Sequence, residues 1–479
     1  MDRKTDTATP ETKQKKHRNR FNRLTSKEWL PFQKSWFRFS DKEKLYRETL
    51  RFFTPADDPG SAVFYKGNEL SLCRRVAEEE NLILTETSDR PLQFAFVDLT
   101  GLVKPGITVA GYKKLREELM PKLEGIYRQL AHRRFLAVFI PNVQKGDTYL
   151  PFAWDLAKHI ATIFSLKDEK IACLEDEPER QAQHFFQPGK SFFYCLYFRK
   201  DEQSSGTYQK PSFDFFQNNI QPASNCFSSS IPAWFILKPQ PRKKHEILHP
   251  AKYPEDLPEL FLPTFTIEGD NVFDPMSGTG STQLAALKMN RNGYGTELSE
   301  FFAGIAQQRC TSFLSSGEAG VTCRIVHADA RDAAWQNFPM MDYIITSPPY
   351  WDMLNMKGAE NQAKRIEKGL QTNYSDDEAD LGNIAAYQDF LQELTEIYLQ
   401  LIPMMKPGSF LTVVVKNIKK KGRNYPFAWD LALALQDHLV LLPEVFWCQD
   451  DISIAPYGYG NTWVSNTFHQ YCLTFQKPF

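Results

Sequence analysis

Several features that mark other classes of protein are missing from this 479-residue sequence. No apolar run approaches the roughly 20 residues that a membrane span needs, and the polar N-terminus contains no apolar leader. The eight cysteines include no CxxC pair, which argues against a zinc site or a disulfide framework. We therefore expect a protein of the reducing cytoplasm with no metal site and no membrane partner.

Strong net charge is also missing, because the formal net charge is −1. Any attraction to nucleic acid must therefore come from local basic patches. The composition, 42% hydrophobic and 24% charged, is that of an ordinary globular chain with room for two or three domains. Residues 1–40 begin with a polar, Lys/Arg-rich stretch, and we expect a flexible basic arm there.

A long internal repeat organises the rest of the chain. The segment Tyr112–Asp155 aligns with Tyr387–Asp430 at a constant offset of 275 residues, and both segments end in the sequence PFAWD. Each copy reads as helix, apolar strand, polar loop, helix and later strand, which is typical of half of an α/β sheet domain. We expect a degenerate half-copy over 41–200, a linker or DNA-contacting segment over 201–245, and a catalytic domain over 246–479.

The two copies differ at one turn. The later copy contains Thr346–Trp351, with the sequence TSPPYW, whereas the earlier copy contains Asp98–Gly101, with no proline pair and no aromatic residue. The earlier copy also has no glycine-rich loop ahead of this position. We therefore expect that it neither binds a cofactor nor catalyses a reaction alone.

The TSPPYW turn follows a short apolar run that reads as a buried strand. Its two prolines remove two backbone donors and fix two φ angles, which leaves a rigid loop rich in carbonyl acceptors. Such a loop suits a planar exocyclic amine, and Tyr350 would stack on the ring that bears it. A proline turn that simply closes a strand would have the same local sequence.

Upstream lies a set of motifs in the order expected for a nucleotide-binding sheet. Val272–Thr282 reads as a strand, a glycine-rich turn and a helix start, with Asp274 at the strand end. The next strand ends in Glu297, which is placed for a ribose diol, and a third is followed by Asp329. The basic run Lys416–Arg423 leaves another predicted strand, and we expect it to contact phosphate.

Together these motifs resemble those of the S-adenosylmethionine-dependent cytosine-N4/adenine-N6 DNA methyltransferases. The resemblance covers about residues 241–479 and implies a Rossmann-like, doubly wound α/β sheet that binds S-adenosyl-L-methionine. It implies double-stranded DNA as the substrate and a cognate restriction endonuclease as a candidate partner. It assigns cofactor binding to Asp274, Pro275, Ser277, Gly278, Thr279, Gly280, Glu297 and Asp329, and the base pocket to Ser347, Pro348, Pro349 and Tyr350.

The resemblance leaves the methylated base open. Serine at the first position of the SPPY motif is similar to the cytosine-N4 group, so we favour cytosine N4 over adenine N6. The motifs are also compatible with an enzyme that acts on an RNA amine, and with a non-catalytic DNA-binding relative. No cysteine lies near the motif, which argues against cytosine-C5 chemistry.

Overall fold

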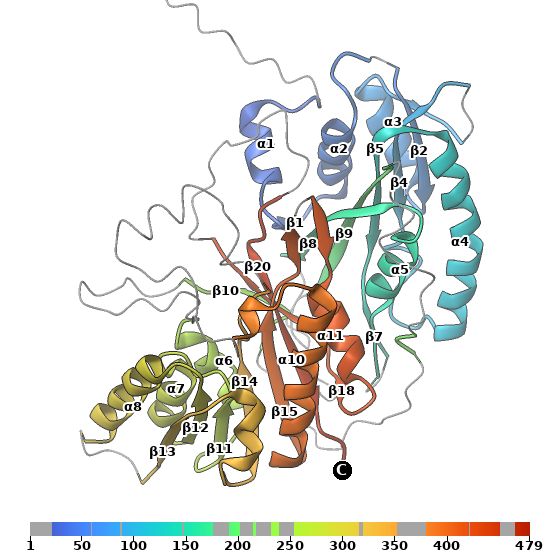
Figure 1. The fold of residues 1–479 in the computed structure, drawn as a ribbon. Helices are drawn as coiled ribbons and strands as arrows, with labels where there is room; N and C mark the ends of the chain where they lie inside the picture. Colours follow the sequence, from blue (N-terminus) through green and yellow to red (C-terminus); the bar gives the residue numbers. More distant parts are fainter. Residues whose placement is uncertain are drawn as a thin grey trace, which may run out of the picture.

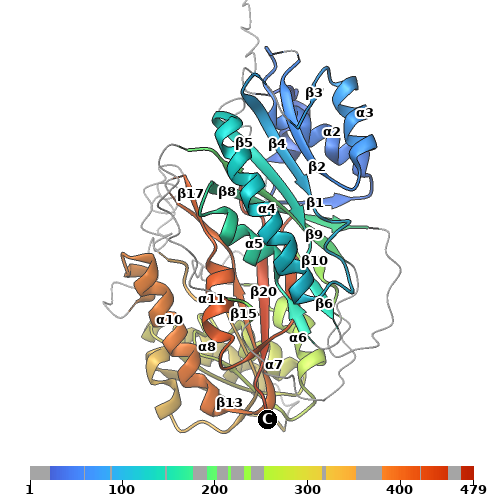
Figure 2. The same ribbon diagram turned by 90° about the vertical axis from the view of Figure 1, so that its right-hand side faces the viewer.

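The protein folds around two α/β sheets that lie one above the other (Figures 1 and 2). The computed structural model describes residues 22–58, 60–86, 89–145, 148–175, 191–201, 214–216, 231–238, 253–315, 320–351, 380–420, 422–450 and 465–479. We call the described part of 22–201 the first copy and that of 231–479 the second copy.

The first copy is a seven-stranded mixed sheet. Its strand order is β1 (Trp36–Phe39), β8 (Ser165–Leu174), β9 (Phe192–Arg199), β5 (Leu130–Ile140), β4 (Leu92–Asp98), β2 (Ala62–Gly67) and β3 (Ile83–Leu84). The helices of this copy are α1 (Ser26–Phe32), α2 (Lys42–Phe53), α3 (Leu70–Glu79), α4 (Val109–Gln129) and α5 (Phe152–Ile160). A small hairpin, β6 (Val143–Lys145) and β7 (Thr148–Leu150), follows β5.

The second copy repeats this plan. Its strand order is β10 (Trp234–Ile236), β19 (Val445–Cys448), β20 (His469–Gln476), β15 (Met405–Val415), β14 (Met341–Thr346), β11 (Asn271–Asp274), β12 (Asn292–Glu297) and β13 (Cys323–His327), with β18 (Val440–Leu441) beside β20. The α-helices are α6 (Asp256–Phe265), α7 (Ser281–Lys288), α8 (Glu300–Leu314), α10 (Tyr387–Leu401) and α11 (Phe427–Leu435). The short 3-10 helices are η2 (Ala330–Trp335), η3 (Leu381–Asn383) and η4 (Ile402–Met404). The hairpin that follows β15 consists of β16 (Ile418–Lys420) and β17 (Arg423–Tyr425).

The likeness between the copies extends further than the aligned segments. The strand pairs β4–β2 and β2–β3 of the first copy correspond to β14–β11 and β11–β12 of the second, all parallel. Within the described residues, the first copy ends at β3 and has no strand equivalent to β13. The N-terminal half is therefore a nearly complete sheet domain that is shortened at the edge where the second copy carries β13.

One hydrophobic cluster runs through both copies. It contains the inward faces of α4, α5, α10 and α11, and separate clusters lie under α2–α3 and under α6–α7. The indole rings of Trp154 and Trp429, at matching positions of α5 and α11, stack with centroids 6.3 Å apart. The central strand β15 is buried along Phe410–Val415, as a sequence that is apolar except at Thr412 predicts. A shared core of this kind joins the copies into one body.

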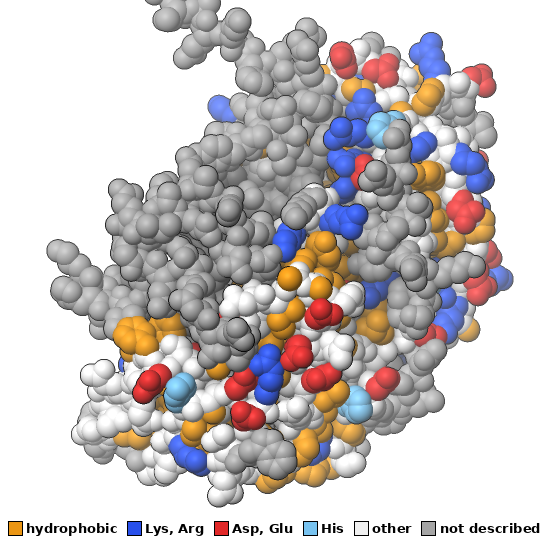
Figure 3. Space-filling model, in the orientation of Figure 1, with side chains coloured by type: hydrophobic (Ala, Val, Ile, Leu, Met, Phe, Trp, Pro, Cys, Tyr) orange, Lys and Arg blue, Asp and Glu red, His pale blue; other side chains and the backbone are white. Residues whose placement is uncertain are grey.

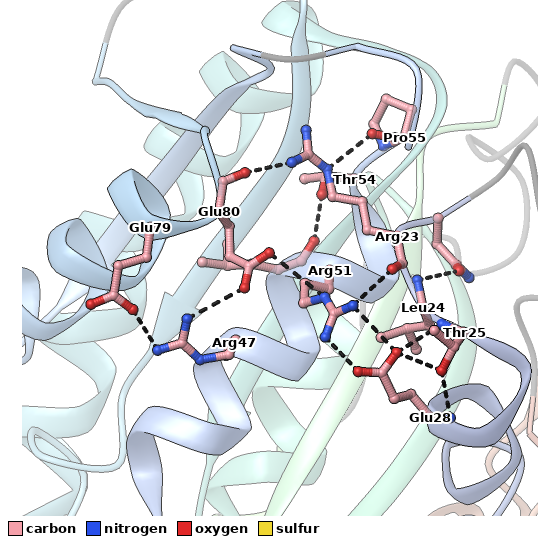
Figure 4. A network of polar contacts seen from close by, with 12 residues as sticks. Arg23, Leu24, Thr25, Glu28, Arg47, Arg51, Thr54, Pro55, Glu79 and Glu80 are labelled. Carbon is pink, nitrogen blue, oxygen red and sulfur yellow. Dashed lines mark hydrogen bonds and ion pairs between the residues drawn. The ribbon is translucent and has the colours of Figure 1, made fainter.

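The prediction of a flexible arm over residues 1–40 is wrong for its second half. Ser26–Phe32 is a helix, because Thr25 and Glu28 form a capping box, and Trp36–Phe39 pairs with β8. Arg23 donates hydrogen bonds to the carbonyls of Pro55 and Glu80 in the network of Figure 4, and also to the carbonyl of Asp58. Residues 1–21 lie outside the described part of the chain.

The predicted linker over 201–245 also contains a sheet element. β10 adds to the second sheet by parallel pairing with β19. Pairing satisfies backbone groups that a linker would leave to water, and Trp234 is buried there. The segments 202–213, 217–230 and 239–252 lie outside the described residues. Of the helices that the structure describes, none is long and apolar enough to span a membrane.

Candidate active site

The glycine turn between β11 and α7 has the backbone of a ligand cradle. Gly278 and Gly280 have φ values of 53° and 79°, which only glycine adopts readily. A Cβ added to Gly280 would lie 2.9 Å from Cβ of Ala306 on α8. The turn is therefore restricted to glycine both by its dihedral angles and by its packing, and it places backbone amides at the start of α7, where a ligand can meet them.

Asp274 lies at the floor of this turn and is 1% exposed. Its carboxylate accepts hydrogen bonds from the hydroxyls of Tyr253 (3.0 Å) and Thr282 (2.8 Å) and from the amide of Met276 (3.0 Å). Burial raises the pKa of Asp274. The sequence analysis assigned a role to Asp274 and none to Tyr253 or Thr282, although Thr282 lies within the motif Val272–Thr282.

Glu297 ends β12 and reaches back to the same turn. Its carboxylate accepts from the amides of Gly278 (2.7 Å) and Ser299 (3.0 Å), and burial raises its pKa. Asp329 follows β13, where it caps η2 and forms an ion pair with Arg331 at 2.7 Å. The three predicted acids thus follow three adjacent parallel strands, β11, β12 and β13.

The SPPY corner begins where β14 ends, directly beside the glycine turn. β14 pairs in parallel with β11, with Phe273 opposite Ile344, so the two strands end side by side. Ser347 donates its hydroxyl hydrogen to the carbonyl of Val414 at 3.1 Å, which ties the corner to β15. The fold therefore brings the proline corner and the glycine turn to one edge of one sheet, as an active site shared between them requires.

The two aromatic side chains of this corner are held by lysines. The Lys416 ammonium lies 4.5 Å from the ring centroid of Tyr350, and the Lys420 ammonium lies 3.9 Å from that of Trp351. The Tyr350 hydroxyl donates to the side-chain oxygen of Gln470 at 2.8 Å. Burial lowers the pKa of Lys416 to about 8. The corner is therefore fixed in place by groups from the β15–β16 connection, the β16–β17 hairpin and β20.

The expectation that the run Lys416–Arg423 contacts phosphate needs correction for three of its lysines, of which Lys416 covers Tyr350 as described above. Lys419 forms an ion pair with Asp168 of the first copy, and Lys420 covers Trp351. Periodicity could not reveal these roles, because both partners are distant in sequence. Arg423, by contrast, is exposed at the hairpin.

Parts of this chain match known proteins. A family model described as a DNA methylase of the N6/N4 type matches residues 112–308, which run from α4 through the glycine turn to α8. The chain is 41% identical to the orphan methyltransferase M.BamHII of Bacillus amyloliquefaciens over 66 residues, which are 14% of this chain and 25% of that protein. It is 37% identical to the Type II methyltransferase M.MjaI of Methanocaldococcus jannaschii over 59 residues, 12% of this chain and 20% of that protein.

Over residues 112–308 the chain is therefore similar to the N6/N4 family of DNA methylases. The matches span a quarter or less of the length of these two relatives. Among solved structures, TrmN from Thermus thermophilus aligns over 44% of each chain at 17% identity with a TM-score of 0.27.

The first copy has different residues at the positions equivalent to the motifs of the second copy. Strand pairing places Tyr65 where the second copy has Asp274, and Asp98 where it has Ser347. Asp98 accepts from the Tyr46 hydroxyl and forms an ion pair with Lys42 at 3.2 Å. A Cβ on Gly67, which ends β2, would lie 2.4 Å from the Tyr65 hydroxyl. Side chains of the first copy thus crowd the end of β2, the strand that is equivalent to β11 of the second copy.

The methyltransferase cofactor, S-adenosylmethionine, fits the donor set of the second copy. The hydroxyls of Thr279 and Ser281 are buried at the turn and have no hydrogen-bond partner among the described residues. Buried polar groups normally have hydrogen-bond partners, so two unpaired hydroxyls beside the glycine turn indicate a ligand-binding site. The acids Asp274 and Glu297 add negative charge close by, which suits a cation.

Proposed function

We propose that this protein transfers a methyl group from S-adenosylmethionine to the exocyclic amine of a flipped base in double-stranded DNA, with cytosine N4 as the favoured position. The observation that carries the proposal is the parallel pairing of β11 and β14. This pairing sets the glycine turn and the SPPY corner next to each other at the carboxyl edge of one sheet.

The motif residues divide the cofactor among them in this proposal. Asp274, Pro275, Ser277 and the turn Gly278–Gly280 hold the methionine part of the cofactor. Glu297 takes the ribose and Asp329 the adenine. Asp274 and Glu297 also hold the turn itself through the bonds they accept from Met276 and Gly278.

The chemistry needs little covalent help from the chain. The cofactor supplies a methyl group on a sulfonium, which is a strong electrophile. The carbonyls of Ser347 and Pro348 accept the two amine hydrogens, which localises the nitrogen lone pair that the base ring otherwise withdraws. Pro349 keeps this corner rigid. Positioning and electrostatics alone then hold the nitrogen lone pair in line with the methyl group.

Tyr350 provides the platform for the base. Extruding a base from a duplex costs roughly a few kcal/mol. Stacking on an aromatic ring returns about 1–3 kcal/mol. The contact between Lys416 and the Tyr350 ring fixes the platform in advance, so little ordering cost is left when the base arrives.

Local charge supports a DNA substrate despite the near-neutral total. On the face drawn in Figure 3, Lys and Arg side chains gather over the first copy, and acidic side chains lie among basic ones over the second. The similarity to a Type II methyltransferase supports a cognate restriction endonuclease as partner, and the free cysteines support a cytoplasmic location.

One experiment tests the function and the base together. The protein is incubated with labelled S-adenosylmethionine and unmethylated DNA, the DNA is digested, and the nucleosides are identified by mass spectrometry. We expect N4-methylcytosine. Detection of N6-methyladenine would show that adenine N6 is the methylated position. Methylation of RNA alone would show that RNA, and not DNA, is the substrate. Binding of the cofactor without any methylated product would favour a non-catalytic DNA-binding role.

A further inference from the structure

The first copy grips the hairpin that follows the catalytic strand. Glu169 on β8 is 1% exposed and accepts from the side-chain amide of Asn417 at 2.8 Å and from the Tyr471 hydroxyl at 2.9 Å. Its neighbour Asp168 is fully buried and forms an ion pair with Lys419. Lys167 donates to the carbonyl of Gly422 at the hairpin turn, at 3.0 Å. Three consecutive residues of β8 thus hold the second copy's hairpin.

The hairpin in turn holds the catalytic corner. The ammonium of Lys420 lies over Trp351, and the ring of Tyr425 meets Trp351 with centroids 4.9 Å apart. Just before the hairpin, Lys416 lies over Tyr350, one residue from Asn417. The contacts form a chain from β8 of the first copy, through the hairpin, to the two aromatic residues of the SPPY corner.

The opposite half of the interface has an equivalent of the Glu169 contacts but none of the ion pair between Asp168 and Lys419. Glu444 of the second copy accepts from the side-chain amide of Asn142 at 2.8 Å and from the Tyr194 hydroxyl at 2.5 Å. These residues match Glu169, Asn417 and Tyr471 across a pseudo-two-fold relation. The ion pair between Asp168 and Lys419 has no mirror image, because the equivalent positions are Pro443 and Gln144.

The residues that the two hairpins can contact also differ between the copies. At the positions of Tyr350 and Trp351 the first copy has Gly101 and Leu102, so the β6–β7 hairpin has no aromatic pair to hold. The extra ion pair is therefore found only on the side of the interface that leads to the SPPY corner.

We propose that the first copy is a built-in positioning subunit, in which Asp168 and Glu169 fix the β16–β17 hairpin and through it the orientation of Tyr350 and Trp351. This inference rests on the proposed methyl transfer. The two acids touch neither base nor cofactor. They act through Asn417 and Lys419, so they are positioning residues.

The pseudo-symmetry supplies a matched pair of variants for the test. Glu169→Ala and Glu444→Ala each remove one buried acid that accepts from an asparagine amide and from the hydroxyl of a strand tyrosine. Each acid has one further contact, since Glu444 also accepts from the Tyr149 hydroxyl and Glu169 lies 3.5 Å from His469. Methyl transfer to unmethylated bacteriophage DNA, S-adenosylmethionine affinity and thermal melting are measured for both. We expect a comparable fall in melting temperature for both, and a roughly 10- to 100-fold fall in kcat for Glu169→Ala only.

Two further readouts separate positioning from general damage. Cofactor affinity should change by less than about twofold in Glu169→Ala, because the hydrogen-bond partners of Glu169 are Asn417 and Tyr471, neither of which belongs to the glycine turn. Amide hydrogen exchange should accelerate over 416–425 in Glu169→Ala and not in Glu444→Ala. The conservative variant Glu169→Gln keeps an oxygen for Asn417 and should restore kcat.

Each opposite outcome contradicts the proposal. Equal loss of kcat in the two alanine variants would make the interface a matter of stability only. Unchanged kcat and unchanged exchange in Glu169→Ala would remove the positioning role while leaving the proposed function intact. Failure of the wild-type protein to methylate any DNA would instead overturn the proposed function, and this inference with it.

Discussion

The two copies share strand order, register and a common core, yet their carboxyl edges differ in what they leave open. The turn after β11 in the second copy contains two glycines, with φ values of 53° and 79°. Two buried hydroxyls at this turn have no hydrogen-bond partner among the described residues. In the first, Tyr46 and Lys42 converge on Asp98 at the equivalent edge. The sheet is therefore only a frame, and a few residues at its edge decide whether it can hold a ligand.

The largest expected effect comes from giving the second copy a side chain at its glycine turn. Gly280→Ala places a Cβ 2.9 Å from Ala306 at a φ of 79°, so we expect cofactor binding to be lost in calorimetry. Gly269→Ala is the matched control, because its φ is 85° and nothing lies within 4 Å of the added Cβ. The control should lose about 1–3 kcal/mol of stability and still bind cofactor.

A smaller effect is expected when the second copy is made like the first at the base platform. Tyr350→Ala removes the ring that Gly101 already lacks, and the lost stacking of about 1–3 kcal/mol corresponds to a roughly 5- to 150-fold fall in turnover. Cofactor affinity should hardly change. Tyr350→Phe keeps the ring and loses only the bond to Gln470, so it should stay close to wild type. Full turnover of Tyr350→Ala in the methyl-transfer assay would refute the base-pocket assignment.

The interface between the copies predicts a pH dependence of stability. Burial raises the pKa of Glu444 to about 8, so the native state keeps its proton where the unfolded chain has lost it. The contribution of Glu444 to the free energy of unfolding is fully present below the pKa that glutamate has in the unfolded chain, about 4.3. It is lost progressively as the pH rises toward 8.

Denaturant unfolding as a function of pH checks this, with Glu444→Gln as the comparison. The variant is neutral at every pH and its amide offers an oxygen to Asn142, so its stability should decline less between these limits. Parallel curves for the two proteins would show that Glu444 does not carry the raised pKa.

The smallest expected effect is a pH dependence that only the second copy can produce. Burial raises the pKa values of Asp274 and Glu297, and a bound cation favours their charged forms. Cofactor affinity should therefore weaken as the pH falls through these raised values, and binding should release protons. Calorimetry in buffers of different ionisation enthalpy measures that release. Uptake of protons on binding would contradict the assignment.

The sequence alone was sufficient for the features that are local in the chain. The glycine turn, the acids at the strand ends and the SPPY corner are read from neighbouring residues, and their side-by-side placement follows from the parallel sheet that the pattern predicts. The constant offset between Tyr112–Asp155 and Tyr387–Asp430 likewise revealed the duplication.

Contacts between the copies could not be predicted in this way. Asp168 and Lys419 are 251 positions apart, and nothing in either segment signals the pair. Without that pair, a basic hairpin is most simply interpreted as a phosphate contact. The prediction of a half-copy also underestimates the first copy. Strand β2 shares only Val63-Phe64 with Val272-Phe273 of β11, which is too short a match to reveal the relation from sequence, and β3 shares no residue with β12. Strand β1 was hidden for the same reason inside a stretch that begins with a basic tail.

The chain contains two sheets of one design and, we propose, a single working site. Titration of the wild-type protein with S-adenosylmethionine in a calorimeter measures this most directly. We expect one cofactor per chain, with binding lost in Gly280→Ala. Two cofactors per chain, or one that stays bound in that variant, would contradict this conclusion.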